Sequence, residues 1–147
     1  MQATRQAFTL IELLAVIIIL AILAGVAIPK YFDYQVSGRE AACKGTLGGV
    51  RAGIVNWYAN EAIENGTAVY PDVTELTTIN EVMQEDIPDN PYGGAPDPGA
   101  VAVQAVFADA QNGVLVGVVG GWAYYEGAGG NPSVFYANTN SVGENTF

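Results

Sequence analysis

The feature that most constrains this chain is an apolar run that extends from residue 8 to residue 28. The run reads FTLIELLAVIIILAILAGVAI and contains one charged residue, Glu12. As a helix rising about 1.5 Å per residue it would span about 31 Å, enough to cross the hydrocarbon core of a bilayer. Only MQATRQA precedes it, with Arg5 as the single charge. A short basic flank on one side and a longer segment on the other predict one membrane span with a cytoplasmic N-terminus.

Glu12 distinguishes between interpretations of this run. A secretory signal peptide would use Arg5 as its basic region, Leu13–Leu23 as its apolar region and the small residues at 25–27 as its cleavage site. A plain signal anchor would need the apolar run alone. Neither interpretation explains Glu12, because a carboxylate within an apolar span costs a few kcal/mol and marks a candidate functional site.

The charge and the missing residue types exclude several classes of function. The 147 residues include five basic, fifteen acidic, no His and one Cys, for a formal charge of −10. All five basic residues lie in the first 51 positions, so the remainder would repel phosphate, and we expect no nucleic-acid binding. Without His, neither a Ser-His-Asp nor a Cys-His nucleophile can form. The single Cys43 excludes an intrachain disulfide. We therefore expect that the chain is not an enzyme.

The segment after the run changes from uniformly apolar to amphipathic. Pro29 removes a backbone donor and clashes with the preceding turn, so we expect the helix to kink or melt locally there. The apolar residues beyond it recur at spacings of four, three, four and four: Cys43, Leu47, Val50, Ile54 and Tyr58. This pattern predicts one buried stripe of a helix over residues 31–60, with Cys43 as an inert core residue. Glycines along the segment weaken that helix, so it must pack on a sheet.

The remaining sequence predicts a small sheet. Thr78 and Glu81 form a capping-box pattern, which predicts a short helix ending near Asp86, and the Pro- and Gly-rich residues 87–99 predict a loop. Four β-rich runs follow: Val101–Phe107, Val114–Val119, Trp122–Tyr125 and Val134–Tyr136. We expect the first two to pair as neighbouring antiparallel strands. The predicted fold class is α+β, in which a long N-terminal helix packs on an antiparallel sheet of about four strands.

The start of the apolar run carries a family resemblance. Residues 7–14 read AFTLIELL and resemble the processing site of type IV pilins and of the pseudopilins of type II secretion. In that family a basic leader ends in a small residue, usually Gly, and prepilin peptidase cuts before a Phe that is then N-methylated. A Glu lies four residues after that Phe, as Glu12 follows Phe8. A Pro lies 21 residues after it in many members, as Pro29 does here. Ala7 stands where Gly is usual.

The resemblance implies a domain organisation and a mechanism. Residues 1–7 would be a leader, cleaved between Ala7 and Phe8, with Phe8 N-methylated. Residues 8–29 would form a transmembrane and filament-core helix, and residues 30–147 a periplasmic or extracellular pilin-like domain. Glu12 would pair with the N-terminal amine of a neighbouring subunit, since a buried carboxylate is tolerated when it is paired. The subunit would wait in the bacterial inner membrane as a single-pass protein with its N-terminus in the cytoplasm.

The resemblance also implies partners and a function. The partners would be prepilin peptidase, an inner-membrane assembly platform, and other pilins or pseudopilins in a homo- or hetero-oligomeric filament. The chain would be a structural subunit of a type IV pilus-like or type II secretion pseudopilus filament. The alternative is a low-copy minor pilin or surface binding protein whose sheet loops recognise a ligand. A third hypothesis is an exported soluble enzyme with its mature N-terminus at Ile28. The absence of a C-terminal cysteine pair favours a pseudopilin or minor pilin over many major pilins.

Calcium is the one candidate cofactor. Asp86, Asp89 and Asp97, with the amide of Asn90, supply hard oxygen ligands within one loop region. The sequence contains no EF-hand spacing, and acidic loop residues that are simply solvated are the alternative.

Overall fold

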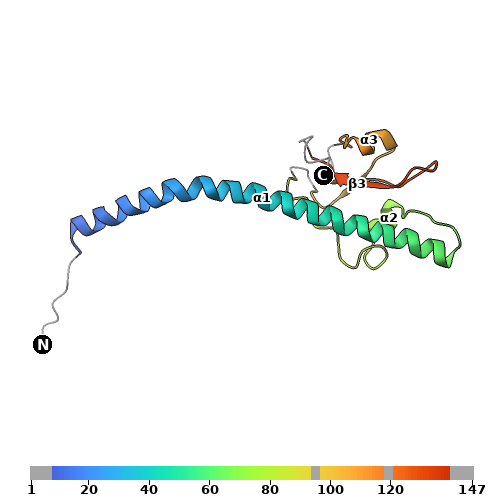
Figure 1. The fold of residues 1–147 in the computed structure, drawn as a ribbon, viewed down its shortest axis with the longest axis horizontal. Helices are drawn as coiled ribbons and strands as arrows, with labels where there is room; N and C mark the ends of the chain where they lie inside the picture. The colour runs from blue at the N-terminus through green and yellow to red at the C-terminus, as the bar shows by residue number, and fades with distance from the viewer. Residues whose placement is uncertain (1–7, 94–96, 118–120, 140–147) are drawn as a thin grey trace, which may run out of the picture. The chain divides into compact units, whose positions relative to one another are not determined.

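The computed structural model describes residues 8–93, 97–117 and 121–139. The elements follow the order α1 (Leu10–Glu64), α2 (Val73–Thr77), β1 (Val101–Val103), α3 (Phe107–Gln111), β2 (Trp122–Tyr125) and β3 (Val134–Ala137) (Figure 1). The chain divides within α1 into two compact units, Met1–Gly38 and Arg39–Phe147. The α+β class predicted from the sequence is therefore confirmed, with a long N-terminal helix and a small sheet.

The first helix carries both the apolar run and the amphipathic stripe. It contains 55 residues and continues through Pro29, so the local melting expected at that residue does not occur. On the stripe, Cys43, Leu47, Val50 and Ile54 are buried as predicted. Tyr58 is half-buried, and its ring stacks on that of Tyr70 at a centroid distance of 4.4 Å.

The sheet has the order β1-β2-β3 and mixes both strand directions. β1 pairs with β2 in parallel, with Val101 opposite Trp122. β2 pairs with β3 antiparallel, with Trp122 opposite Ala137 and Tyr125 opposite Val134. The described residues thus contain three strands instead of the expected antiparallel four. The two C-terminal strands were predicted correctly, but the expected pairing of the first two runs is wrong.

A buried glutamine explains why the first predicted strand is shorter than expected. The run over residues 101–107 leaves the sheet after Val103, and its last residue opens α3. The Gln104 side chain donates to the Tyr136 hydroxyl at 3.3 Å and accepts from the Val106 backbone N–H at 3.2 Å. The side chain thereby bonds to the backbone N–H two residues ahead, and the chain turns away from the strand path.

A side-chain amide takes the place of the second predicted strand. Residues 114–117 form no strand, and residues 118–119 of that prediction lie outside the described residues. The Val116 N–H donates to Asn138 Oδ1 at 2.9 Å, and Asn138 Nδ2 donates to the Val116 carbonyl at 3.0 Å. Both backbone groups of Val116 are therefore satisfied without a strand partner.

The short helix predicted from Thr78 to about Asp86 is also wrong. Residues 78–85 form turns, bends and an isolated bridge between Ile79 and Met83, and Asn80 has a φ of 69°, a left-handed conformation that ends any helix there. A capping box does exist six residues earlier and opens α2. Asp72 Oδ1 accepts from the Glu75 N–H at 2.8 Å, and the Glu75 carboxylate accepts from the Asp72 N–H at 2.8 Å.

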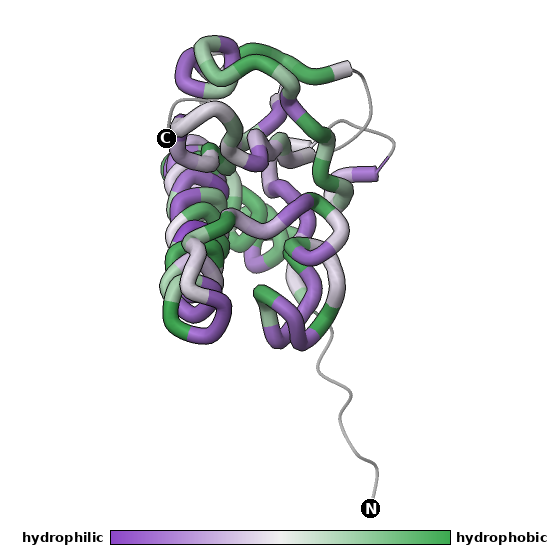
Figure 2. The backbone as a smooth tube through the Cα atoms, turned by 90° about the vertical axis from the view of Figure 1, so that its right-hand side faces the viewer, coloured by the Kyte–Doolittle hydropathy of each residue, from purple (hydrophilic) through white to green (hydrophobic). Residues whose placement is uncertain are grey.

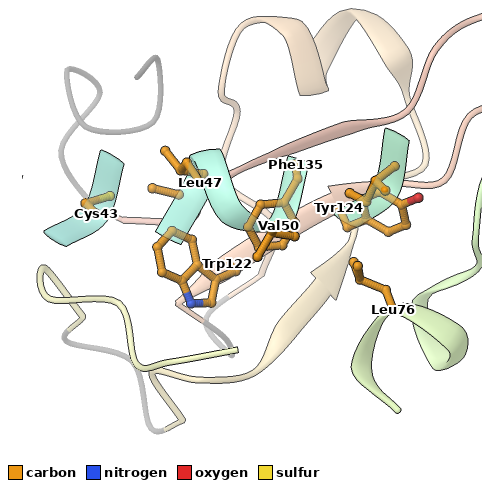
Figure 3. Packing of buried hydrophobic residues seen from close by; sticks show 9 residues of the cluster. Cys43, Leu47, Val50, Leu76, Trp122, Tyr124 and Phe135 are labelled. Atoms are coloured by element: carbon orange, nitrogen blue, oxygen red, sulfur yellow. The ribbon is translucent and has the colours of Figure 1, made fainter. Parts of the chain in front are cut away.

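The core of the second unit forms on both faces of the sheet. Trp122, Tyr124 and Phe135 pack with the α1 stripe and with Leu76 of α2, as Figure 3 shows. The opposite face packs with α3 through a second cluster: Ala110, Ala123, Tyr125 and Tyr136. The alternation of side chains along β2 assigns successive residues to opposite faces, and burial on both faces explains why all four of its residues are buried.

Candidate functional site

The first turn of α1 holds Glu12 in a local hydrogen-bond network with Thr9. Glu12 Oε2 accepts from the Thr9 backbone N–H at 2.9 Å and from the Thr9 hydroxyl at 2.7 Å. In return the Glu12 N–H donates to Thr9 Oγ1 at 3.4 Å. Because α1 begins at Leu10, Thr9 is the N-cap and Glu12 the third helical residue, which is the geometry of a capping box.

This network has two consequences for the carboxylate. It lies at a helix N-terminus, where the helix dipole favours a negative charge. Both donors from Thr9 reach one oxygen, Oε2, and no described residue donates to Oε1. The network lowers the cost of placing Glu12 in an apolar environment and leaves Oε1 for a donor from outside this chain. The sequence predicts Glu12 as a site residue, and its Thr-x-x-Glu spacing is the signal that also indicates Thr9, which the prediction from the apolar run does not include.

The apolar surface around this site is large and uncovered. Every side chain from Phe8 to Val36 is exposed, with 77% of Phe8 and 61% of Val36 accessible. Among the described residues, α1 is the one helix long and apolar enough to cross a membrane. An exposed apolar patch of this extent marks a surface that contacts a membrane or other protein chains.

The remaining predicted assembly and processing residues lie on or before α1. Pro29 lies within the exposed part of the helix. Tyr31 and Phe32 follow it, with their rings in edge contact at 6.3 Å. Ala7, the residue before the predicted cleavage point, lies outside the described residues. The structure therefore brings Thr9 and Glu12 together and leaves the cleavage prediction untested.

The three predicted calcium ligands share one surface hollow. Asp86, Asp89 and Asp97 line a depression of about 420 Å³. The described residues contain no group of three His, Cys, Asp or Glu side chains able to hold a metal ion. The Asn90 amide is engaged within the fold, donating to the Gly121 carbonyl and accepting from the Tyr92 N–H at 3.0 Å. Calcium binding remains a prediction from the sequence.

The fold and this site define a class of protein. A helix with an exposed apolar half, a capped carboxylate in its first turn and a second half packed on a small sheet is built for membrane anchoring and for association through that helix. Residues 3–28 match the family described as the prokaryotic N-terminal methylation motif.

Three curated proteins are similar to this chain. The chain is 32% identical over 127 residues to the type IV major fimbrial protein FimA of Dichelobacter nodosus, covering 86% of this chain and 74% of FimA. It is 32% identical over 86 residues to the fimbrial protein EcpC of Eikenella corrodens, covering 56% of each. It is 37% identical over 70 residues to the type IV major pilin protein PilE1 of Neisseria gonorrhoeae, covering 46% of this chain and 33% of PilE1. No solved structure matches.

The chain belongs to the type IV pilin family. Membership in this family makes it a structural protein and not an enzyme. The chain spans about half the length of EcpC and a third of PilE1. The relatives are pilins and fimbrial proteins, so the pseudopilin branch stays a prediction.

Proposed function

We propose that this chain is the structural subunit of a type IV pilus-like filament and assembles through α1. The observation that carries the proposal is the exposed apolar half of α1 with Glu12 in its first turn. A helix that is apolar on every side must be buried all round. Lipid would cover it before assembly, and the α1 helices of other subunits would cover it in the filament.

Processing creates the partner that Glu12 lacks within its own chain. Prepilin peptidase cuts between Ala7 and Phe8 on the cytoplasmic side of the inner membrane, and N-methylation of Phe8 leaves its α-amine positively charged. That amine, on an incoming subunit, donates to Glu12 Oε1 of the adjacent subunit. Thr9 already holds the other oxygen, so the carboxylate is oriented before the partner arrives. Pairing offsets the cost of the buried charge and fixes the axial register between the two subunits.

Substitution of Glu12 tests this mechanism. Glu12→Leu removes the carboxylate from the apolar half of α1, so the variant should insert in the membrane and be processed as efficiently as the wild type. It should yield no filaments by electron microscopy, because the incoming amine has no acceptor. Glu64→Gln is the matched control, since Glu64 is an exposed carboxylate near the other end of the same helix and should assemble normally. Normal filaments from Glu12→Leu would contradict the proposal.

A second candidate function is favoured by one feature of the sheet loops. Residues 127–132 of the β2–β3 connection line a hollow of about 350 Å³ together with Tyr58 and Tyr70. Paired aromatic rings beside a glycine-rich loop suit a surface protein whose loops recognise a ligand. Counting subunits per filament distinguishes the two functions, because a binding protein is present in a few copies and a major subunit forms the whole shaft.

A further inference from the structure

A hollow at the end of the β2–β3 hairpin lacks charge, although it belongs to an acidic unit. Arg39–Phe147 contains three basic and thirteen acidic residues, for a formal charge of −10. Figure 2 shows hydrophilic residues recurring along the loops of this unit. No charged side chain among the described residues lines the hollow, whose walls are residues 127–132 and four others: Tyr58, Ala68, Val69 and Tyr70. The hollow is therefore a neutral concavity of about 350 Å³ in an acidic unit.

Two tyrosines give the hollow an aromatic wall. Tyr58 lies on α1 and Tyr70 precedes α2, and their rings stack at a centroid distance of 4.4 Å. A Cβ at Gly127 would lie 2.7 Å from Cδ2 of Tyr70, so glycine at this position lets the loop backbone approach the ring. Both tyrosines are half-buried, and neither hydroxyl forms a hydrogen bond with a described residue. The wall thus offers aromatic carbon for apolar contacts and two hydroxyls for hydrogen bonds.

A glycine turn gives the hollow a polar wall. The Asn131 N–H donates to the Ala128 carbonyl at 3.1 Å and closes a turn whose central residues, Gly129 and Gly130, have φ values of 62° and 84°. Positive φ at both central positions is typical of a type I′ turn and favours glycine. Neither glycine N–H forms a hydrogen bond with a described residue, and neither does the exposed side-chain amide of Asn131. These groups supply the hollow with uncharged donors and an amide acceptor.

The loop that carries this turn is held in place by two further contacts. The Tyr125 hydroxyl donates to the Ala128 carbonyl at 3.3 Å and accepts from the Ala128 N–H at 3.2 Å. Glu126 Oε1 accepts from the Val73 N–H at 3.0 Å, which joins the start of the loop to α2. A ligand that enters the hollow therefore meets a formed site and does not have to order the loop.

The composition of the walls indicates the class of ligand. The acidic unit repels anions, and a cationic ligand would find no carboxylate in the hollow with which to pair. Aromatic carbon beside uncharged donors and acceptors matches a molecule with a C–H face and several hydroxyls, as a sugar ring has. The volume lies at the small end of the range for ligand sites, about 300–1,000 Å³. These properties fit an uncharged hexopyranose.

We propose that this hollow binds an uncharged hexopyranose ring, an inference that rests on the second candidate function and names its ligand class. The tyrosine wall packs on the C–H face of the ring, and the turn with Asn131 hydrogen-bonds to its hydroxyls. A free sugar and the terminal ring of a glycan share this chemistry. The hollow lies entirely within Arg39–Phe147, so binding does not depend on the apolar half of α1.

Saturation-transfer NMR of the full chain in sugar-free detergent micelles tests the ligand class. The probes are the methyl glycosides of glucose, galactose and mannose, and at least one should bind with a Kd of about 1 mM. Glucose 6-phosphate should bind at least about tenfold more weakly, because the acidic unit repels its phosphate. Retention of the chain on beads that carry the bound sugar would assign the ligand to a glycan, whereas glycoside binding without retention would assign it to a free sugar.

Two substitutions locate the binding. Asn131→Ala should weaken glycoside binding about fivefold, and Tyr58→Leu should weaken it about tenfold. The matched controls are Asn56→Ala and Tyr34→Leu, which alter exposed residues of α1 outside the hollow and should bind as the wild type does. The exposed Asn131 amide forms no hydrogen bond with a described residue, so Asn131→Ala should keep the wild-type denaturation midpoint even if Tyr58→Leu does not fold.

The outcomes separate the ligand class from the functions proposed above. If no glycoside shows saturation transfer, or if an oligoproline peptide binds in their place, the ligand class is refuted, and subunit counting still decides the second candidate function. If glycosides bind Asn131→Ala and Tyr58→Leu as tightly as the wild type, the hollow is not the site and the proposal is refuted. Weakened glycoside binding by Asn131→Ala that still forms normal filaments would support the proposal and separate binding from assembly.

Discussion

Tyr124→Phe should be less stable than the wild type at neutral pH and more stable than the wild type in strongly alkaline solution. The Tyr124 side chain is fully buried, and its hydroxyl donates to the Pro71 carbonyl at 2.8 Å. Removing the hydroxyl leaves that buried carbonyl without its donor, which costs about 1–2 kcal/mol of unfolding free energy at neutral pH. The variant should therefore be less stable than the wild type at pH 7.

The sign changes in alkaline solution. Burial raises the pKa of Tyr124 far above its ordinary value, because the phenolate is poorly solvated inside the fold. Below about pH 10 the phenol is protonated in both folded and unfolded chains, and the pH has no effect through this group. Above that value the unfolded chain releases a proton that the folded chain retains, so wild-type stability falls by about 1.4 kcal/mol per pH unit. Tyr124→Phe lacks this loss, and the two stability curves should cross at about pH 10.7 to 11.5, where the loss equals the ~1–2 kcal/mol that the hydroxyl contributes.

Denaturant unfolding of the full chain in detergent micelles, followed by tryptophan fluorescence, measures both effects. The pKa of Tyr136 is also raised by burial, but Tyr136 is present in both proteins and contributes equally to their slopes. Tyr34→Phe is the control, because Tyr34 is 72% exposed and should follow the wild type at every pH. Parallel stability curves for the wild type and Tyr124→Phe, without a crossing, would refute the reasoning.

Three further substitutions test the packing of the second unit by the same unfolding measurement. Leu47→Ala should lower the free energy of unfolding by about 2–5 kcal/mol, because Leu47 is 1% exposed in the core. Its control, Val55→Ala at a 62% exposed position, should change it by less than about 0.5 kcal/mol, and equal losses would contradict the assigned stripe. Gly121→Ala should destabilise the fold strongly, because a Cβ there would overlap the Pro98 carbonyl oxygen, and a tolerated change would contradict this close approach. Gly49→Ala, with open space around it on α1, should instead stabilise the fold by about 0.5–1 kcal/mol. Arg51→Leu should cost about 1–3 kcal/mol, because a β3 carbonyl loses both of its guanidinium donors, and an unchanged denaturation midpoint would show that those bonds contribute nothing.

The helical half of the fold could be predicted because its signals are local and periodic. The stripe from Cys43 to Ile54 repeats with the period of a helix, and all of its members are buried. The capping residues Thr9 and Asp72 were equally visible, since each precedes a Glu by three residues. The same spacing at Thr78 opens no helix, because Asn80 adopts a left-handed conformation that no helix can continue, so the spacing alone does not show which of the three sites caps a helix.

The sheet was predicted less well because distant residues decide its edges. The run after Val101 looks like one strand, but the hydroxyl of Tyr136, 32 positions further along the chain, accepts from Gln104 and helps to turn the chain away. Val116 lies in another β-rich run, and the amide of Asn138 satisfies its backbone in place of a strand. Propensity cannot reveal such contacts, because they depend on which side chain the fold brings near.

The candidate site, too, could be predicted from the sequence only in part. Glu12 was identified from the cost of a charge in an apolar run, which needs no structure. That both Thr9 donors reach Oε2 and leave Oε1 open required the structure, because the spacing alone does not show which carboxylate oxygen a donor reaches.

The mature N-terminus of the filament subunit tests the central claim most directly. Mass spectrometry of purified filaments should find a chain that begins at Phe8 and carries one methyl group on its α-amine. Only such a chain supplies the charged amine that Glu12 is expected to accept. A subunit that begins at Ile28, or one that keeps Met1, would contradict the account.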